Sequence, residues 1–204
     1  MRLGKAIAER LRAEGWRVIT SSHRADAGAD IVADLAEPMG PAKLYAAALQ
    51  ILGGIPPDAL VNNAALFTGD AAAIAVVNLE APKKLTMLMA GRETGVGSIV
   101  NILDTKVLDA YRRLPTPTDA YLVSKRELFA YTRASAATFA ATLRVNGVAP
   151  GPVLAPTDVH VKAGETLLDR RPTADDVAAA VSYLLGAESV TGATIPVDAG
   201  QHLT

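Results

Sequence analysis

The chain contains no cysteine, and only 4% of its residues are aromatic. Without thiols, disulfides, thiol catalysis and cysteine-ligated zinc are excluded. The formal net charge is only −1, and the sequence lacks the strongly basic composition of a nucleic-acid-binding protein. No run of about 18 apolar residues occurs, so we expect neither a membrane-spanning helix nor a membrane partner.

The first fifteen residues interleave charged and apolar side chains. A secretory signal needs a continuous apolar core, so we expect a cytoplasmic protein. Leu3, Ile7 and Leu11 recur every four residues, which predicts an amphipathic helix closed by Gly15. Half of the 204 residues are hydrophobic, enough for a sizeable core, and this length predicts one domain over residues 1–204.

Segments typical of strands alternate with helical ones along nearly the whole chain. The predicted strands are residues 16–20, 30–34, 59–63, 98–103, 143–148 and 194–198. The predicted helices that follow the first one are residues 43–52, 73–91 and 119–142 and one that begins at Thr173. This alternation indicates βαβ units, and therefore an α/β fold with a doubly wound parallel sheet and three layers. Pro82 bends the 73–91 helix or marks a late start, and Pro196 favours an edge position for the last strand.

Three predicted strands are followed by polar residues or by glycine. The segments concerned are Asn62-Asn63, Asp104 and Pro150-Gly151. In open parallel sheets, ligands bind beyond the carboxyl ends of the strands. We therefore expect these three segments to meet at one rim and to form the functional site.

Tyr121 and Lys125 lie four residues apart on a predicted helix, so they share one face near its N-terminus. A free phenol has a pKa of about 10. A nearby ammonium group and the positive end of the helix both favour the ionised phenol. A tyrosine in this place can give a proton to a carbonyl or imine near neutral pH. Taken alone, this spacing is common by chance, and an ordinary surface pair is the alternative.

The order of short motifs along the chain resembles that of the short-chain dehydrogenase/reductase family. The motifs are Asn62-Asn63-Ala64, Asn101-Ile-Leu-Asp104, Tyr121-Leu-Val-Ser-Lys125, Pro150-Gly151 and Val190-Thr-Gly192. As an ordered set they cover almost the whole chain and are highly specific. The resemblance implies a Rossmann-like fold, a homodimer or homotetramer, and a nicotinamide cofactor that contacts Asn63, Ala64, Gly151 and Val153 as well as Tyr121 and Lys125.

Asp104 stands where most members of that family have a serine. An aspartate here is similar to the pteridine reductases, in which it assists the tyrosine in protonating the pterin ring. The resemblance thus implies that Tyr121, Lys125 and Asp104 are catalytic and that the substrate is pteridine-like or another small carbonyl or imine compound. A solvated aspartate at a strand end, or an acid that serves other chemistry in the family, is the alternative for Asp104. Thr105 is a candidate to supply the hydroxyl of the missing serine. Asn78 resembles the helix-borne asparagine that supports the lysine through water, with a local helix bond as the alternative.

The residues that follow the strand predicted at 16–20 favour NADP(H) over NAD(H). An acidic residue after this strand binds the ribose 2′-hydroxyl of NAD, whereas arginine accommodates the 2′-phosphate of NADP. The segment has no acid at the strand end, and His23-Arg24 resembles the 2′-phosphate pair of the pteridine reductases. Asp26 and Asp30 follow, and they leave NAD open as the alternative.

Two further segments resemble cofactor contacts of the family. Arg2-Leu3-Gly4 is similar to the end of its glycine-rich loop, which implies that Arg2 and Leu3 touch the cofactor. The preceding strand and first glycines of that loop are absent, so we expect a fold that is N-terminally truncated relative to the family, with Met1 an internal methionine of a longer product or the chain shortened. Asp34-Leu35 resembles the contact to the adenine edge, with a simple strand-end cap as the alternative.

Two competing functions stay open at this stage. One is a generic carbonyl reductase of the same family with a non-pterin substrate, and the other is a degenerate, non-catalytic member that acts as a binding or assembly protein. The retained set of Tyr121, Lys125 and Asp104 argues against the second. No metal site is expected. Four small residues of the 119–142 helix permit close packing, either between subunits or inside the monomer: Ala130, Ala134, Ala137 and Ala141.

Overall fold

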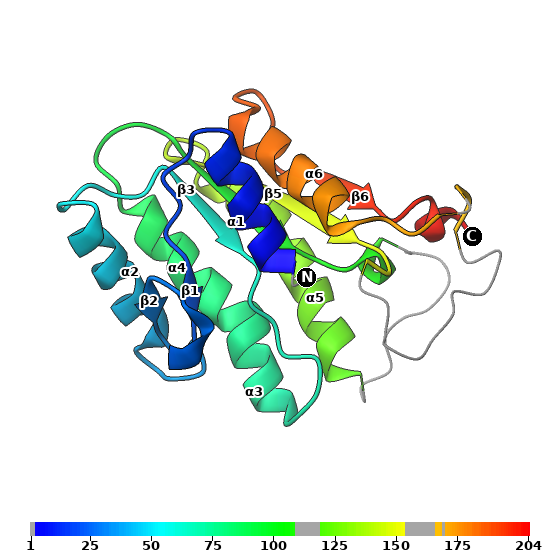
Figure 1. The fold of residues 1–204 in the computed structure, drawn as a ribbon, viewed down its shortest axis with the longest axis horizontal. Helices are drawn as coiled ribbons and strands as arrows, with labels where there is room; N and C mark the ends of the chain where they lie inside the picture. Colours follow the sequence, from blue (N-terminus) through cyan, green and yellow to red (C-terminus); the bar gives the residue numbers. More distant parts are fainter. Residues whose placement is uncertain (1–2, 109–118, 154–165, 169) are drawn as a thin grey trace.

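The centre of the molecule is a parallel β-sheet in the order β3-β4-β5-β6 (Figure 1). The structure is a computed structural model that describes residues 3–108, 119–153, 166–168 and 170–204. The four strands are β3 (Ala59–Asn62), β4 (Gly97–Ile102), β5 (Leu143–Pro150) and β6 (Thr194–Val197). A separate two-stranded parallel sheet pairs β1 (Ser21–Ser22) with β2 (Ile31–Val32). The predicted parallel α/β architecture is confirmed, and Pro196 lies on the edge strand β6, as expected.

Helices cover both faces of the four-stranded sheet. They are α1 (Leu3–Ala13), α2 (Gly40–Ile51), α3 (Ala71–Ala75), α4 (Ala81–Ala90), α5 (Ala120–Thr138) and α6 (Ala174–Gly186), with short turns η1 (Ala25–Ala27), η3 (Thr105–Val107) and η4 (Gln201–Leu203). Val100 and Ile102 of β4 pack with α1 and α6. Ile99 points the other way and packs with Met89 of α4 and Ala136 of α5. Since successive strand residues face opposite sides, these contacts define three layers.

Helices α1 and α6 lie side by side on one face of the sheet (Figure 1). α1 buries Ile7 and Leu11, and Gly15 follows with a φ of 91°, so the predicted amphipathic helix and its glycine stop are confirmed. α6 begins at a capping box in which Thr173 and Asp176 satisfy each other's backbone N–H groups. None of the helices in the described ranges has the length and apolar content needed to cross a bilayer.

The helix predicted at 73–91 begins earlier and is interrupted. Asp70 caps α3 by accepting hydrogen bonds from two backbone N–H groups. A π turn, η2 (Val76–Glu80), then joins α3 to α4, in whose first turn Pro82 lies. Proline has no backbone N–H, so it cannot donate the hydrogen bond that the carbonyl four residues before it would accept in an α-helix. The wider π turn before Pro82 accommodates this missing hydrogen bond.

The strand predicted at 16–20 is wrong. Residues 16–20 form no strand ladder, and β1 consists of Ser21–Ser22 alone. The apolar pattern that suggested a strand is explained by packing, because Trp16 and Val18 lie against the core cluster shared by α1 and α6. The helix predicted at 119–142 is shorter than expected and ends at Thr138.

Candidate active site

Three adjacent parallel strands place their carboxyl ends at one rim of the sheet. β3 pairs with β4, and β4 pairs with β5. Asn63, Asp104 and Gly151 come one or two residues after the ends of β3, β4 and β5. The predicted meeting of the three segments is therefore confirmed. A buried chain of amides aligns the strands: Asn62 donates to Asn101 over 2.8 Å, and Asn101 donates to the hydroxyl of Thr132 on α5 over 2.9 Å.

Asp104, Tyr121 and Lys125, which we call the proton-transfer end, are brought together by β4 and α5. The Tyr121 hydroxyl donates a hydrogen bond to the Asp104 carboxylate over 3.1 Å. Lys125 is only 2% exposed, and its ammonium nitrogen lies 5.9 Å from the centroid of the Tyr121 ring. The same nitrogen donates to the carbonyl of Ile102 over 2.7 Å. The four-residue spacing predicted this shared face correctly.

The electrostatics of this end differ from the expectation. Burial raises the pKa of Tyr121 well above its ordinary value, and the charge of Asp104 and its hydrogen bond raise it further. Burial lowers the pKa of Lys125 to about 8, against the opposing pull of Asp104. The expected bias of Tyr121 toward phenolate is therefore wrong, because burial and a neighbouring carboxylate outweigh the ammonium and the helix end. The geometry provides a protonated phenol, which is a hydrogen-bond and proton donor.

Asn78 occupies the π turn and is 1% exposed. Its amide bonds to both backbone groups of Leu66, at 2.7 and 2.9 Å, and donates to the hydroxyl of Ser124 over 3.0 Å. Ser124 in turn donates to the carbonyl of Tyr121 over 2.7 Å. Among the described residues Asn78 thus reaches α5 through Ser124 and fixes the loop after β3. It makes no direct hydrogen bond to Lys125 there.

Phe67 is a residue that the sequence reasoning missed. Its side chain is 67% exposed, and its ring stacks on that of Tyr121 with centroids 4.7 Å apart and planes inclined by 27°. The two rings border a cavity of about 390 Å³ that is lined by Phe67, Thr68, Gly69, Ile74, Asp119, Ala120 and Tyr121. An aromatic residue soon after the strand-end Asn63, in a chain with few aromatics, was the signal available in the sequence.

Thr105 does not take the place of the missing serine. Its hydroxyl is buried and donates a hydrogen bond to the carboxylate of Asp198, which follows β6. The sequence placed Thr105 next to Asp104 but gave no sign of this partner, since 93 residues separate the two.

The Pro150-Gly151 segment also packs against Asp198. A Cβ atom on Gly151 would lie 2.7 Å from Cβ of Asp198, so no side chain fits there. The N–H of Gly151 donates to the carbonyl of Val197 over 3.0 Å. Val153, two residues on, packs against the core shared by α1 and α6. Both predicted cofactor residues of this segment thus lie at the rim or just behind it.

The start of α1 abuts the end of β3. A Cβ atom on Gly4 would lie 2.7 Å from the side-chain amide nitrogen of Asn63, so any larger residue at this position would require the Asn63 side chain to move. Leu3 begins α1 and packs against its core, and Ala64 is exposed after Asn63. Arg2, also predicted to contact the cofactor, lies outside the described residues.

His23, Arg24, Asp34 and Leu35, which we call the nucleotide end, lie beside the small β1–β2 sheet. His23 and Arg24 are exposed. Arg24 forms a two-pronged ion pair with Asp26, with nitrogen–oxygen distances of 2.8 and 2.5 Å, and this pairing raises the pKa of Arg24 and lowers that of Asp26. Asp26, one of the acids that left NAD open as the alternative, therefore pairs with the guanidinium that was predicted to bind the 2′-phosphate.

The other half of the nucleotide end follows β2. The Asp34 carboxylate accepts a hydrogen bond from the N–H of Ala36 over 2.8 Å and so makes the turn that leads to α2. Leu35, half-buried, lies in that turn. A strand-end cap and an adenine contact are compatible, because within the described ranges only one carboxylate oxygen of Asp34 accepts a hydrogen bond. In the described part of the chain, no cluster of three or more His, Asp or Glu side chains is suited to hold a metal ion.

Comparisons with known proteins fit this geometry. The family profile described as enoyl-(acyl carrier protein) reductase matches residues 2–202. The chain belongs to the short-chain dehydrogenase/reductase family. It is 30% identical to protein FixR of Bradyrhizobium diazoefficiens over 98% of this chain and 83% of that one.

Two solved structures extend the likeness to the whole fold. The structure of FolM alternative dihydrofolate reductase 1 from Brucella canis, complexed with NADP, is 31% identical, with a TM-score of 0.85 over 100% of this chain and 91% of that chain. A blue fluorescent protein from a metagenomic library, in complex with NADPH, is 26% identical, with a TM-score of 0.85 over 98% and 94% of the two chains. The family's members are oxidoreductases, and the proton-transfer end of this chain retains the groups for such chemistry.

Proposed function

We propose that the protein is an NADPH-dependent oxidoreductase that reduces a pteridine-like or other small carbonyl or imine compound, with Tyr121 as proton donor. The observation that carries this proposal is the hydrogen bond from the Tyr121 hydroxyl to Asp104, beside the buried ammonium of Lys125. Because the pKa of Tyr121 is raised, the phenol keeps its proton at neutral pH. A reductase needs such a donor, since the atom that accepts a proton after hydride transfer carries developing negative charge.

The residues at the rim fit a nicotinamide cofactor. Asn63, Ala64 and Gly151 lie just beyond the carboxyl ends of β3 and β5, where ligands of open parallel sheets bind. Bound NADPH would supply the hydride. Lys125 holds positive charge 5.9 Å from the phenol ring, where it stabilises the tyrosine oxygen as its proton leaves.

A flat, nitrogen-rich substrate ring fits the surroundings of the phenol. The exposed ring of Phe67 offers an apolar face next to Tyr121, and planar rings stack favourably on such faces. Asp104 is a carboxylate that can accept hydrogen bonds from an amino-pyrimidine edge. A cavity of about 390 Å³ suits a small molecule. The neighbour from Brucella canis is described as an alternative dihydrofolate reductase, which agrees with a substrate of this class.

NADP(H) is the proposed cofactor because the nucleotide end offers a histidine and an arginine. His23 and Arg24 are exposed after β1, and guanidinium groups bind phosphate well. Both solved neighbours described above contain NADP or NADPH. The ion pair with Asp26 has to open, or to share Arg24, when a 2′-phosphate binds.

We further propose a cytoplasmic homodimer or homotetramer with no nucleic-acid or membrane partner. Four small residues on or just after α5 are exposed and open to a second subunit: Ala130, Ala134, Ala137 and Ala141. Sedimentation analysis tests the assembly, and a monomer at micromolar concentration would contradict it.

The first experiment measures thermal unfolding with NADPH and with NADH. A ligand at 100 times its dissociation constant adds roughly 2.7 kcal/mol to the free energy of unfolding. We expect stabilisation by NADPH and a weaker response to NADH. Absence of any response to either nucleotide would favour the non-catalytic alternative.

The second experiment measures NADPH oxidation with a panel of pterins and simple carbonyl compounds, using the wild type and Asp104→Ser. Asp104→Ser restores the serine that most of the family has. We expect pterin reduction to collapse in this variant while simple carbonyl reduction survives. Equal loss on both substrate classes would contradict a specific role of Asp104 toward pterins.

A further inference from the structure

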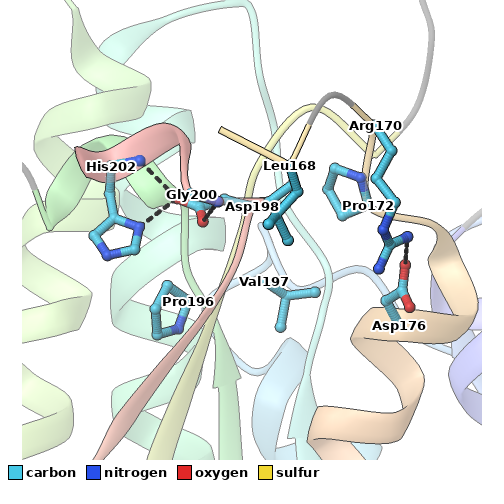
Figure 2. A pocket seen from close by; sticks show the side chains of 10 residues that line it. Leu168, Arg170, Pro172, Asp176, Pro196, Val197, Asp198, Gly200 and His202 are labelled. Carbon is cyan, nitrogen blue, oxygen red and sulfur yellow. Dashed lines mark hydrogen bonds and ion pairs between the residues drawn. The ribbon is translucent and has the colours of Figure 1, made fainter. Parts of the chain in front are cut away.

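A buried carboxylate outside the proton-transfer end is the most heavily hydrogen-bonded acid in the described part of the chain. Asp198, directly after β6, is 2% exposed. One of its oxygens accepts from the Thr105 hydroxyl, from the ring nitrogen Nδ1 of His202 at 2.8 Å and from the His202 N–H at 2.9 Å. The other accepts from the N–H of Gly200 at 3.0 Å. Figure 2 shows dashed lines that run from His202 to the turn formed by Asp198 and Gly200.

The hydrogen bond from Thr105 connects the C-terminal segment to the loop that carries Asp104. Thr105 is the first residue of η3, and Asp104 is its N-cap. One oxygen of Asp104 accepts from the N–H of Lys106 at 2.9 Å, and the other accepts from the Tyr121 hydroxyl. A shift of η3 would therefore move the carboxylate that faces the phenol.

The C-terminal turn is already closed without the Thr105 bond. Gln201 donates to the carbonyl of Asp198, and Leu203 donates to that of Gly200, both over 3.1 Å. Burial raises the pKa of Asp198, but hydrogen bonds from Thr105 and His202 outweigh it and leave the pKa below its ordinary value. Asp198 is thus an anion and a strong acceptor, and charge-assisted bonds hold their geometry better than neutral ones.

We propose that Asp198 is a positioning residue, which through Thr105 fixes η3 and so sets the hydrogen bond between Asp104 and Tyr121. This role rests on the proposed function, in which Asp104 and Tyr121 handle the proton. It assigns a part in the reaction to the C-terminal segment, which contributes none of the groups at the proton-transfer end.

The test compares Thr105→Val, which removes the hydroxyl at nearly constant shape, with Thr105→Ser, which keeps it. Thr86→Val is the matched control, because Thr86 is also buried and its hydroxyl interacts with Pro82 and Tyr131 rather than with η3 or Asp198. We expect Thr105→Val to lower kcat by about 10- to 100-fold, with KM for NADPH within about twofold of wild type. Thr105→Ser should recover most of kcat, and Thr86→Val should retain it.

Amide hydrogen exchange gives a readout that does not need turnover. The N–H of Lys106 reports directly on the Asp104 cap. In Thr105→Val and in Asp198→Asn we expect it to exchange about tenfold faster or more, and in Thr86→Val at the wild-type rate. If the wild type proved inactive, the proposed function would fail, but the exchange rates would still decide whether Asp198 holds this loop.

Two results would overturn the positioning role. One is a Thr105→Val variant whose kcat matches that of Thr86→Val. The other is an unchanged exchange rate for Lys106 in both Thr105→Val and Asp198→Asn.

Discussion

The two ends of the candidate site differ in how their charged groups are held. At the proton-transfer end, Lys125 is 2% exposed and is bonded to the backbone of β4, and Tyr121 bonds to Asp104. At the nucleotide end, Arg24 and Asp26 are both exposed and pair with each other on the surface. Exposed pairs of this kind contribute little to stability and rearrange easily.

This difference separates two tasks. A buried, bonded group keeps its position before the ligand arrives, and preorganisation of this kind favours the chemical step. An exposed pair can exchange partners when a phosphate approaches, so the nucleotide end suits binding. Changes at the proton-transfer end should therefore alter turnover more than affinity, and changes at the nucleotide end should do the reverse.

Tyr121→Phe should have the largest effect. The change removes the hydroxyl but keeps the ring that stacks on Phe67. We expect turnover to fall by about 10²- to 10⁴-fold, because general acid catalysis is lost, while the dissociation constant of NADPH stays within about twofold. Stopped-flow reduction and fluorescence titration measure the two quantities. Retained turnover would mean that another group donates the proton.

Lys125→Met should separate turnover from stability. The pKa of Lys125 is lowered to about 8, so the folded protein holds this proton less tightly than the unfolded chain does. The resulting penalty is present in full below pH 8 and disappears as the pH rises toward 10.5. The comparison is made with Tyr121→Phe in both proteins, one with Lys125 and one with Lys125→Met. Between pH 8 and pH 10.5, the free energy of unfolding of the Lys125 protein should rise by about 3 kcal/mol relative to that of the Met variant. Turnover of the single variant should fall by about 10²-fold.

Urea unfolding at several pH values measures that difference. Identical pH dependence of the two proteins would show that Lys125 is not destabilised by burial. The control is Lys43→Met, since Lys43 is exposed and lies on α2.

Arg24→Ala and Asp26→Asn should shift NADPH affinity in opposite directions. Loss of one charged hydrogen bond to phosphate weakens binding by about tenfold. Asp26→Asn frees Arg24 from its ion pair and should tighten NADPH binding. NADH affinity should change little in either variant. An equal effect on both nucleotides would place the 2′-phosphate elsewhere.

Thr173→Ala should have the smallest effect and leave both ends intact. It removes one half of the capping box at the start of α6. We expect a loss of about 1 kcal/mol in the free energy of unfolding, with kcat unchanged.

The ion pair with Arg170 holds the pKa of Asp176 at about 2. The contribution of Asp176 to stability is therefore present above pH 3.8 and is lost toward pH 2.

Patterns confined to one element predicted that element well. The apolar run of β4 and the four-residue spacing of Tyr121 and Lys125 both describe a single strand or helix, and both predictions are confirmed. The polar residues and the glycine that follow three predicted strands likewise predicted the rim at which the strand ends meet.

Features that depend on a distant partner could not be read from the sequence. Residues 16–20 have the composition of a strand, but a ladder needs a neighbour to pair with. The raised pKa of Tyr121 depends on burial and on Asp104, which lies on another element. The bond of Thr105 to Asp198 joins positions from opposite ends of the fold's second half. Local propensity carries no information on such long-range partners.

The separation of the β1–β2 sheet from the larger sheet affects the local unfolding of the protein. A short two-stranded pair is at best marginally stable by itself, so this corner opens at a lower free energy than the four-stranded core. A dinucleotide that touches both parts would close that opening, and part of its binding free energy would be spent on ordering the corner. The measured affinity for the cofactor would then report on local folding as well as on contact.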